Sequence, residues 1–353
     1  MGRVRDGDNM KKIGIMTGGA DCPGLNSVIR AVVRKGMQEG YVVTGIKNGW
    51  LGLIENDMRV LDVKSTTGIL DKGGTILGTS RVNPLNDDEQ IRKIKDHYAR
   101  SGMDALIVIG GEETIKIALS LHKKGIIQAV AVPKSIDNAL SGTDYAFGFD
   151  TAVNIATECI DRLHTTAESH HRIMVVEVMG LYTGWLAVHA GIAGGADIIL
   201  IPEIPVNLAE VYELLRERHK RGKPFSIIVV SEGTKIEGYM ARSSETVSVM
   251  EKRRFGSVGE YLAKVIEDNT NYETRVSVLG YILRGGSPTA FDRVLGTRLG
   301  VKAVELVKEH KFGKMASLRE NKIRYVDMEE AVSQRKLVNM DLVEIANVFS
   351  AKH

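Results

Sequence analysis

The chain has 353 residues, of which 43% are hydrophobic and 26% are charged, and its formal net charge is +3. This composition is typical of a soluble globular protein and excludes a collagen-like, low-complexity or disulfide-stapled chain. The small net charge argues against nucleic acid or an anionic membrane as a partner. The length predicts about two domains.

The first residues of the chain and its cysteines indicate in which cellular compartment the protein is located. Cys22 and Cys159 cannot form a disulfide framework, which favours a reducing environment. The first residues are polar and contain no apolar core of a secretory signal. No apolar run reaches the ~20 residues of a membrane-spanning helix. We therefore expect a cytoplasmic protein.

Short apolar segments alternate along the chain with longer amphipathic ones. The predicted strands are Lys12–Met16, Ala105–Ile109, Ala129–Val132 (closed by Pro133), Ile173–Val178, Ile198–Ile201, Ser226–Val230 and Val276–Leu279, with helices at about 25–40 and 113–124. Apolar strands separated by helices are typical of mainly parallel sheets covered on both faces. The sequence predicts an α/β protein with two doubly wound lobes that share one cleft. The polar region 234–271, with the basic cluster at 252–254, is expected to form surface helices or an insertion.

Four loops after predicted strands contain residues suited to phosphate chemistry. They are TGGADCPGLN at 17–26, GGTILGTSR at 73–81, GGEET at 110–114 and PKSIDNA at 133–139. Helix-start N–H groups and arginine bind phosphate, adjacent carboxylates suit Mg²⁺, and Lys, Ser and Asp supply a cation, a hydroxyl and a base. Each loop also has a plain structural interpretation as a turn or an acidic first helical turn. The residues alone leave both interpretations open.

Eight blocks in order resemble the phosphofructokinase family. They are GGADCPGLN, GGTILGTSR, GGEET, PKSIDN, FGFDTA, VVEVMG, SEG and LRGGSP, and they extend from about residue 12 to 300. The resemblance implies two α/β lobes with the active site in the cleft between them and more than one crossing of the chain. We expect a phosphoryl-donor lobe from 10–148 plus about 283–333, and a sugar-phosphate lobe from 149–282 plus about 334–353.

The resemblance also implies an activity and a set of residue roles. The reaction is phosphoryl transfer to the 1-hydroxyl of fructose 6-phosphate, which gives fructose 1,6-bisphosphate, with Mg²⁺ as cofactor. The implied catalytic residues are Asp137 as the base, Ser135 and Lys134. The implied donor-binding residues are Gly19, Ala20, Arg81, Gly111, Glu113 and Thr114, with Glu112 at the metal. The implied sugar-phosphate residues are Ser135, Asp137, Arg172, Met179, Gly180, Glu232, Arg275, Tyr281 and Arg284.

Two of these arginines imply an oligomer. In the family, arginines at the positions of Arg172 and Arg275 reach in from a neighbouring subunit. The resemblance therefore implies a homodimer or homotetramer with sites shared between subunits.

The phosphoryl donor depends on two positions. Pyrophosphate-using members of the family carry an acidic residue where this chain has Glu113, and ATP-using members commonly have Gly there. A carboxylate at this place would repel an α-phosphate, which pyrophosphate lacks. Lys134 adds a charge beside a small anionic donor, although some ATP-dependent relatives share it. Pyrophosphate is favoured over ATP, and the enzyme could serve glycolysis or gluconeogenesis.

Four departures from the family pattern leave a third hypothesis open. Ala139 and Leu181 stand where the family has Asp and Arg, Ala20 replaces Gly, and Tyr281 replaces His. The third hypothesis is a catalytically weakened paralogue that binds sugar phosphate or acts on another sugar phosphate.

Overall fold

The chain forms two compact units. The computed structural model describes residues 11–239 and 256–348. The first unit contains Met1–Ser135, Leu140–Gly148 and Gly285–Arg335; the second contains Ile136–Ala139, Phe149–Arg284 and Lys336–His353. The chain thus passes between the units several times. The four residues 136–139, expected in the donor lobe, group with the second unit instead.

The first unit is built on an eight-stranded, mainly parallel sheet. Its strands are β1 (Lys12–Thr17), β2 (Val42–Ile46), β3 (Met58–Leu61), β4 (Ala105–Gly110), β5 (Ala129–Ser135), β6 (Phe147–Gly148), β11 (Lys314–Arg319) and β12 (Lys322–Asp327). The order is β12-β11-β5-β4-β1-β2-β3, and β6 pairs with β5. Only the edge strands β3 and β12 run antiparallel to their neighbours in this described sheet. This topology confirms the predicted α/β class.

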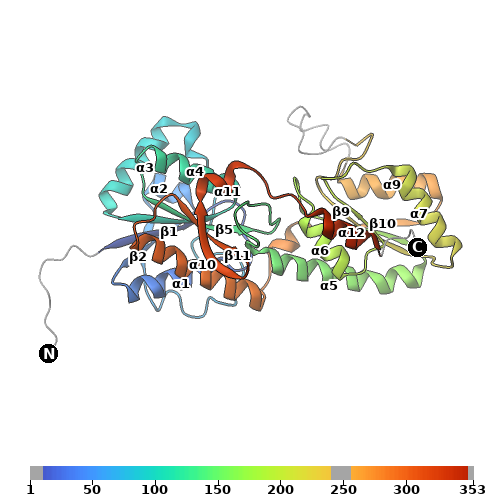
Figure 1. Cartoon of the computed structure of the whole chain (residues 1–353), viewed down its shortest axis with the longest axis horizontal. Helices are drawn as coiled ribbons and strands as arrows, with labels where there is room; N and C mark the ends of the chain where they lie inside the picture. Colours follow the sequence, from blue (N-terminus) through green and yellow to red (C-terminus); the bar gives the residue numbers. More distant parts are fainter. Residues whose placement is uncertain (1–10, 240–255, 349–353) are drawn as a thin grey trace, which may run out of the picture. The chain divides into compact units, whose positions relative to one another are not determined.

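Helices cover both faces of this sheet. They are α1 (Leu25–Gln38), α2 (Trp50–Glu55), α3 (Asp88–Ser101), α4 (Glu112–Lys123), α10 (Ala290–Lys308) and α11 (Met328–Ser333), with a 3₁₀ turn η1 (Pro84–Asn86). α1 packs against α10 on one face, and α2, α3, α4 and α11 lie on the other (Figure 1). All six residues of β4 are buried, which explains why that strand shows no polar alternation.

The end of β5 differs from the prediction. We expected Pro133 to close this strand, and that expectation was wrong, because β5 continues to Ser135. Proline lacks a backbone N–H and is tolerated where few ladder bonds are needed. Here Pro133 pairs with Gly110, the last residue of β4, and β6 then takes over as the partner of Lys134 and Ser135.

The second unit has a four-stranded parallel sheet in the order β10-β7-β9-β8. Its strands are β7 (Ile173–Val178), β8 (Ile198–Leu200), β9 (Ser226–Ser231) and β10 (Thr274–Val278). Its helices are α5 (Phe149–His170), α6 (Trp185–Ala193), α7 (Leu208–Lys220), α9 (Val258–Thr270) and α12 (Met340–Val348), with a 3₁₀ turn η2 (Gly280–Arg284). α7 and α9 cover one face of the sheet, and α5 and α6 cover the other (Figure 1). α12 packs on α6.

The polar region 234–271 contains a core helix. α9 begins with a capping box between Ser257 and Glu260 and buries Val258, Leu262 and Ile266. Its apolar face packs against β7 and β9, so this part of the region is not a surface helix alone. The basic cluster at 252–254 lies outside the described residues.

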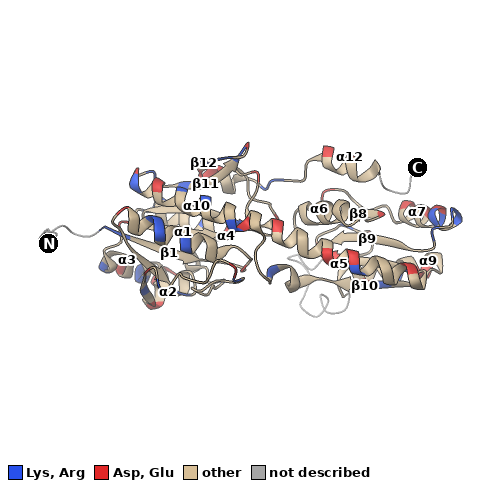
Figure 2. Ribbon diagram, turned by 90° about the horizontal axis from the view of Figure 1, so that it is seen from below, with Lys and Arg blue, Asp and Glu red and all other residues tan. Residues whose placement is uncertain are grey.

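Charges of both signs are interspersed on the surface. Figure 2 shows Lys and Arg beside Asp and Glu along helices such as α5 and α7. Within residues 11–239 and 256–348, no helix has the length and hydropathy needed to cross a membrane.

Candidate active site

The first unit has a topological switch point at β1. Its neighbour β2 lies on one side and β4 lies on the other. The helices α1 and α4, which follow β1 and β4, lie on opposite faces of the sheet, and open α/β sheets bind ligands in the crevice at such a point. The predicted donor loops at 17–26 and 110–114 follow these two strands.

These two loops meet over the buried side chain of Thr114. Gly18 N–H donates to the carbonyl of Ile109 at 2.9 Å. A Cβ on Gly18 would lie 2.6 Å from Thr114 Cγ2, and one on Gly110 would lie 2.4 Å from Thr114 Cβ. Both distances are too short for a real contact. Glycine at these positions thus lets the two loops close on Thr114.

The loop at 73–81 joins the same cluster. Gly19 N–H donates to the carbonyl of Ser80 at 3.1 Å, and the hydroxyl of Thr79 donates to the carbonyl of Gly19 at 2.6 Å. The next residue, Arg81, is exposed. The backbone of the first loop is therefore fixed from two sides, and a guanidinium follows directly.

Lys134 connects the fourth loop to the first. Its side chain is buried, at 6% exposure, and its ammonium donates to the carbonyl of Ala20. The structure thus brings Gly19, Ala20, Thr114 and Lys134 together. Ser135 is the last residue of β5, one step further along the same strand.

The two carboxylates of the loop at 110–114 have different surroundings. Glu112 Oε1 lies 2.5 Å from Lys116 Nζ, and its Oε2 accepts from Arg335 Nε at 2.9 Å. Partial burial raises the pKa of Glu112, but the hydrogen bond from Lys116 and the charge of Arg335 outweigh it and hold the pKa below its ordinary value. Glu113 has a side chain that is 76% exposed, 3.6 Å from Lys116.

Arg335 was missed at the sequence level. It lies 223 positions from Glu112, in no motif that the sequence displays. Only the tertiary structure brings it to the start of α4.

Glu112 suits a metal that arrives with a phosphate. Within the described ranges, no group of three or more His, Cys, Asp or Glu side chains could hold a metal ion. Mg²⁺ is commonly held by one or two protein carboxylates together with substrate phosphates. A single carboxylate beside loops that are predicted to bind phosphate fits that arrangement.

In the second unit, Asp137, Gly180 and Glu232 are neighbours. The hydroxyl of Thr183 donates to the carbonyl of Asp137 at 3.3 Å. Gly180 N–H lies 3.4 Å from Glu232 Oε1. A Cβ on Gly180 would lie 2.6 Å from the carbonyl of Thr183, and the φ of Gly180 is +139°. This tight turn joins the end of β7, where Met179 lies, to Asp137 and Glu232.

Tyr281 and Arg284 follow the carboxyl end of β10. The guanidinium carbon of Arg284 lies 5.0 Å from the centre of the Tyr281 ring. Tyr281 is 74% exposed. Arg284 Nε is buried and has no hydrogen-bond partner among the described residues.

Arg172 and Arg275 lie at the opposite side of the same sheet, where its strands begin. Arg172 directly precedes β7, and Arg275 is the second residue of β10. Both pair with Glu273, Arg172 Nε at 2.8 Å from its carboxylate. Six residues of β7 separate Arg172 from the Met179 end by roughly 20 Å. Within one chain, these arginines do not join the other sugar-phosphate candidates.

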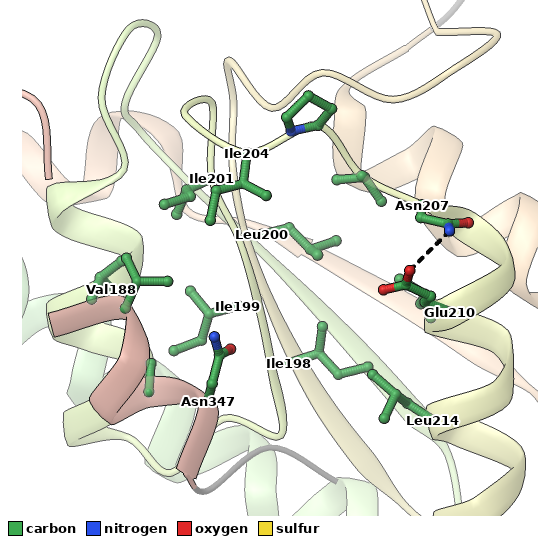
Figure 3. A pocket seen from close by; sticks show the side chains of 15 residues that line it. Val188, Ile198, Ile199, Leu200, Ile201, Ile204, Asn207, Glu210, Leu214 and Asn347 are labelled. Carbon is green, nitrogen blue, oxygen red and sulfur yellow. Dashed lines mark hydrogen bonds between the residues drawn. The ribbon is translucent and has the colours of Figure 1, made fainter. Parts of the chain in front are cut away.

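The second unit also contains a cavity of about 220 Å³. Figure 3 shows apolar side chains of β8, including Ile199 and Leu200, at its base, with α7 and α12 beside it. At its rim, the amide of Asn207 donates to Glu210 Oε1 at 3.0 Å. None of the predicted site residues is among those that line it.

Comparison with known proteins identifies the family. A family model described as phosphofructokinase matches residues 12–307. A pyrophosphate–fructose 6-phosphate 1-phosphotransferase of Streptomyces coelicolor is 52% identical over 96% of this chain and 99% of its own length. ATP-dependent 6-phosphofructokinase 2 of Clostridium perfringens is 46% identical over 94% of each chain. The crystal structure of Pichia pastoris phosphofructokinase in the T-state matches with a TM-score of 0.83 and 29% identity, covering 98% of this chain and 37% of that longer chain. Its fold, its ordered motifs and these matches show that the chain belongs to the phosphofructokinase family.

Proposed function

We propose that this protein transfers a phosphoryl group from pyrophosphate to the 1-hydroxyl of fructose 6-phosphate. The products are fructose 1,6-bisphosphate and inorganic phosphate. The relative that is 52% identical to this chain is named for this reaction, and the match covers 99% of that relative's length.

The buried charge of Lys134 carries the choice of donor. Lys134 is only 6% exposed, and a charge acts more strongly where little water screens it. Its bond to the carbonyl of Ala20 places the charge at the loop where donor phosphates are expected. Pyrophosphate concentrates its negative charge in a small volume, which suits such a site. The exposed carboxylate of Glu113 on the first turn of α4 disfavours a donor with a further phosphate.

The chemistry follows from the proposed roles. The carboxylate of Asp137 takes the proton from the 1-hydroxyl, and the sugar oxygen forms a bond to phosphorus. The bond to the leaving phosphate breaks at the same centre. Ser135 and Lys134 contact the transferring group, and their dipole and charge stabilise it.

The donor contacts come from the loop cluster of the first unit. The N–H groups of Ala20 and Gly111, the Arg81 guanidinium and the Thr114 hydroxyl would hold the donor oxygens. Gly19, whose N–H already donates to the carbonyl of Ser80, would let the backbone approach the donor closely. As a member of this family the chain is expected to need a divalent metal, and we propose Mg²⁺ held by Glu112. The metal would neutralise charge on the phosphates.

The sugar phosphate would be held by two sets of residues. Met179, Gly180, Glu232, Tyr281 and Arg284 lie at the carboxyl edge of the second sheet. Arg172 and Arg275 lie at the amino edge, which supports the proposal that they serve the site of a neighbouring subunit. Shared sites of this kind would require a homodimer or homotetramer, and we propose that it is located in the cytoplasm.

ATP is the second candidate donor. A relative that is 46% identical is named as ATP-dependent. A catalytically weakened paralogue is the third candidate, and Ala139 and Leu181 favour it because the family has Asp and Arg at these positions.

A donor assay tests the proposal. Purified protein with fructose 6-phosphate and Mg²⁺ is given either pyrophosphate or ATP, and Asp137→Asn serves as the inactive control. Product with pyrophosphate alone is the expected result. Product with ATP alone would refute the donor argument. No product with either donor, together with heat protection by fructose 6-phosphate, would establish a binding protein instead.

A further inference from the structure

The predicted metal carboxylate is already engaged by two cations of the chain itself. Lys116 Nζ lies 2.5 Å from one oxygen of Glu112, and Arg335 Nε donates to the other at 2.9 Å. The Glu112 side chain is only 25% exposed, against 36% for Arg335. This partly buried triad stands at the first turn of α4, one residue after Gly111.

Arg335 is held in position by its backbone. It forms an antiparallel bridge with Leu140, a buried residue that follows the loop at 133–139. The nearby helix α11 packs against α4. The guanidinium therefore reaches the donor loops from a fixed segment and not from a free tail.

The triad has a consequence when a phosphate donor binds. A metal and Arg335 compete for the same carboxylate of Glu112, since both are cations. A phosphate oxygen and Glu112 likewise compete for the guanidinium of Arg335, which binds either kind of oxyanion well. If both exchanges occur together, every charge remains paired.

We infer that Arg335 is a donor-phosphate-binding residue that rests on Glu112 while the donor is absent. When the donor binds, Arg335 leaves Glu112 and donates to a phosphate oxygen. Oε2 of Glu112 then becomes available to the metal that accompanies the phosphate, while Lys116 stays at Oε1. No covalent bond changes in this step. The inference rests on the proposed function, because it requires a phosphate donor at these loops.

The test compares Arg335→Gln with a matched variant. Arg319→Gln also removes a guanidinium of the first unit that pairs with a glutamate. Arg319 Nη2 lies 2.6 Å from Glu330 Oε1, and the Arg319 side chain is 43% exposed. Binding of pyrophosphate with Mg²⁺ is measured by calorimetry without fructose 6-phosphate. We expect Arg335→Gln to bind about tenfold more weakly or worse, as for a lost hydrogen bond to a charged group. Arg319→Gln should bind like the wild type.

A second measurement separates this role from a structural one. Binding of Mn²⁺ alone is followed by electron paramagnetic resonance on the donor-free protein. Arg335→Gln should bind Mn²⁺ more tightly than the wild type, because Glu112 has lost a competing cation. If Arg335 only positioned Glu112, binding of Mn²⁺ would weaken or stay unchanged. Either of those results, or unchanged pyrophosphate binding, would overturn the inference.

The two proposals fail in different ways. A wild-type protein that binds ATP but not pyrophosphate would refute the proposed donor, and the same comparison made with ATP would still decide the role of Arg335. Arg335→Lys keeps the charge without the planar fork and should recover part of the donor affinity, which guards against a folding defect of the glutamine variant.

Discussion

Glu113→Gly should shift donor use towards ATP. The side chain of Glu113 is 76% exposed and its ion pair with Lys116 spans 3.6 Å. An exposed pair contributes about 0–1 kcal/mol, and glycine in a helix costs about 1 kcal/mol, so the fold should survive. Two like charges about 5 Å apart repel by about 0.8 kcal/mol in water and about 3 kcal/mol at an effective dielectric constant of 20. Relief of that repulsion corresponds to a gain of roughly 4- to 200-fold.

The assay is kcat/KM for each donor at saturating fructose 6-phosphate. Glu113→Gly should raise the value for ATP within that range and change the value for pyrophosphate much less. Glu89→Gly is a matched control, since Glu89 also lies in the first turn of a helix, is 62% exposed and pairs with Lys93 at 2.8 Å. Glu113→Gln separates charge from size. Unchanged use of ATP in both Glu113 variants would refute the reasoning.

Three further predictions follow from the second unit and the loop at 133–139. Gly180→Ala should lower the free energy of unfolding by about 1–3 kcal/mol and weaken fructose 6-phosphate binding, because its φ is +139° and its Cβ would lie 2.4 Å from a serine hydroxyl; Gly222→Ala, at φ +78° in open space, controls for φ alone. Burial raises the pKa of Glu177 above its ordinary 4.5, with a contribution from Glu232, so the folded protein loses stability as the pH rises above that value. Denaturant titrations should therefore show a stability advantage of Glu177→Gln that grows from pH 4.5 to neutral pH, and a constant difference would contradict the assignment. Ala139→Asp should leave turnover unchanged if the existing carboxylates compensate for the missing one, whereas a large gain in rate would show that they do not.

Most of the parallel strands could be predicted from their apolar runs, but the parallel strands β2, β6 and β11 were not predicted. The segment Ala105–Ile109 is apolar throughout and all of it is buried in β4, so its pattern has one interpretation. The edge strand β12 has mostly exposed residues, and β3 has only four residues. Such short or solvated strands give no pattern that a sequence can display, and neither was predicted.

The candidate site could be predicted only where its residues form a pattern within one short segment of the sequence. The glycines around Thr114 stand in recognisable loops because close backbone approach restricts their residue type. Arg335 reaches Glu112 through a tertiary contact that leaves no local signal in the sequence. The separation of Arg172 from the Gly180 turn could have been deduced, since Arg172 opens a strand and the turn closes it.

The first unit is built from segments that are far apart in the sequence, and this affects how it can fold during synthesis. β11 pairs with β5, and α10 packs on α1. However, β11 and α10 belong to the late segment 285–335 of that unit. A ribosome adds roughly 5–20 residues per second, so the stretch 149–284 delays these partners by on the order of ten seconds. During that interval the nascent chain presents an unpaired edge of β5 and the apolar face of α1. Strand edges and apolar surfaces of this kind promote aggregation, so the first unit is most vulnerable to aggregation before residues 285–335 have been synthesised.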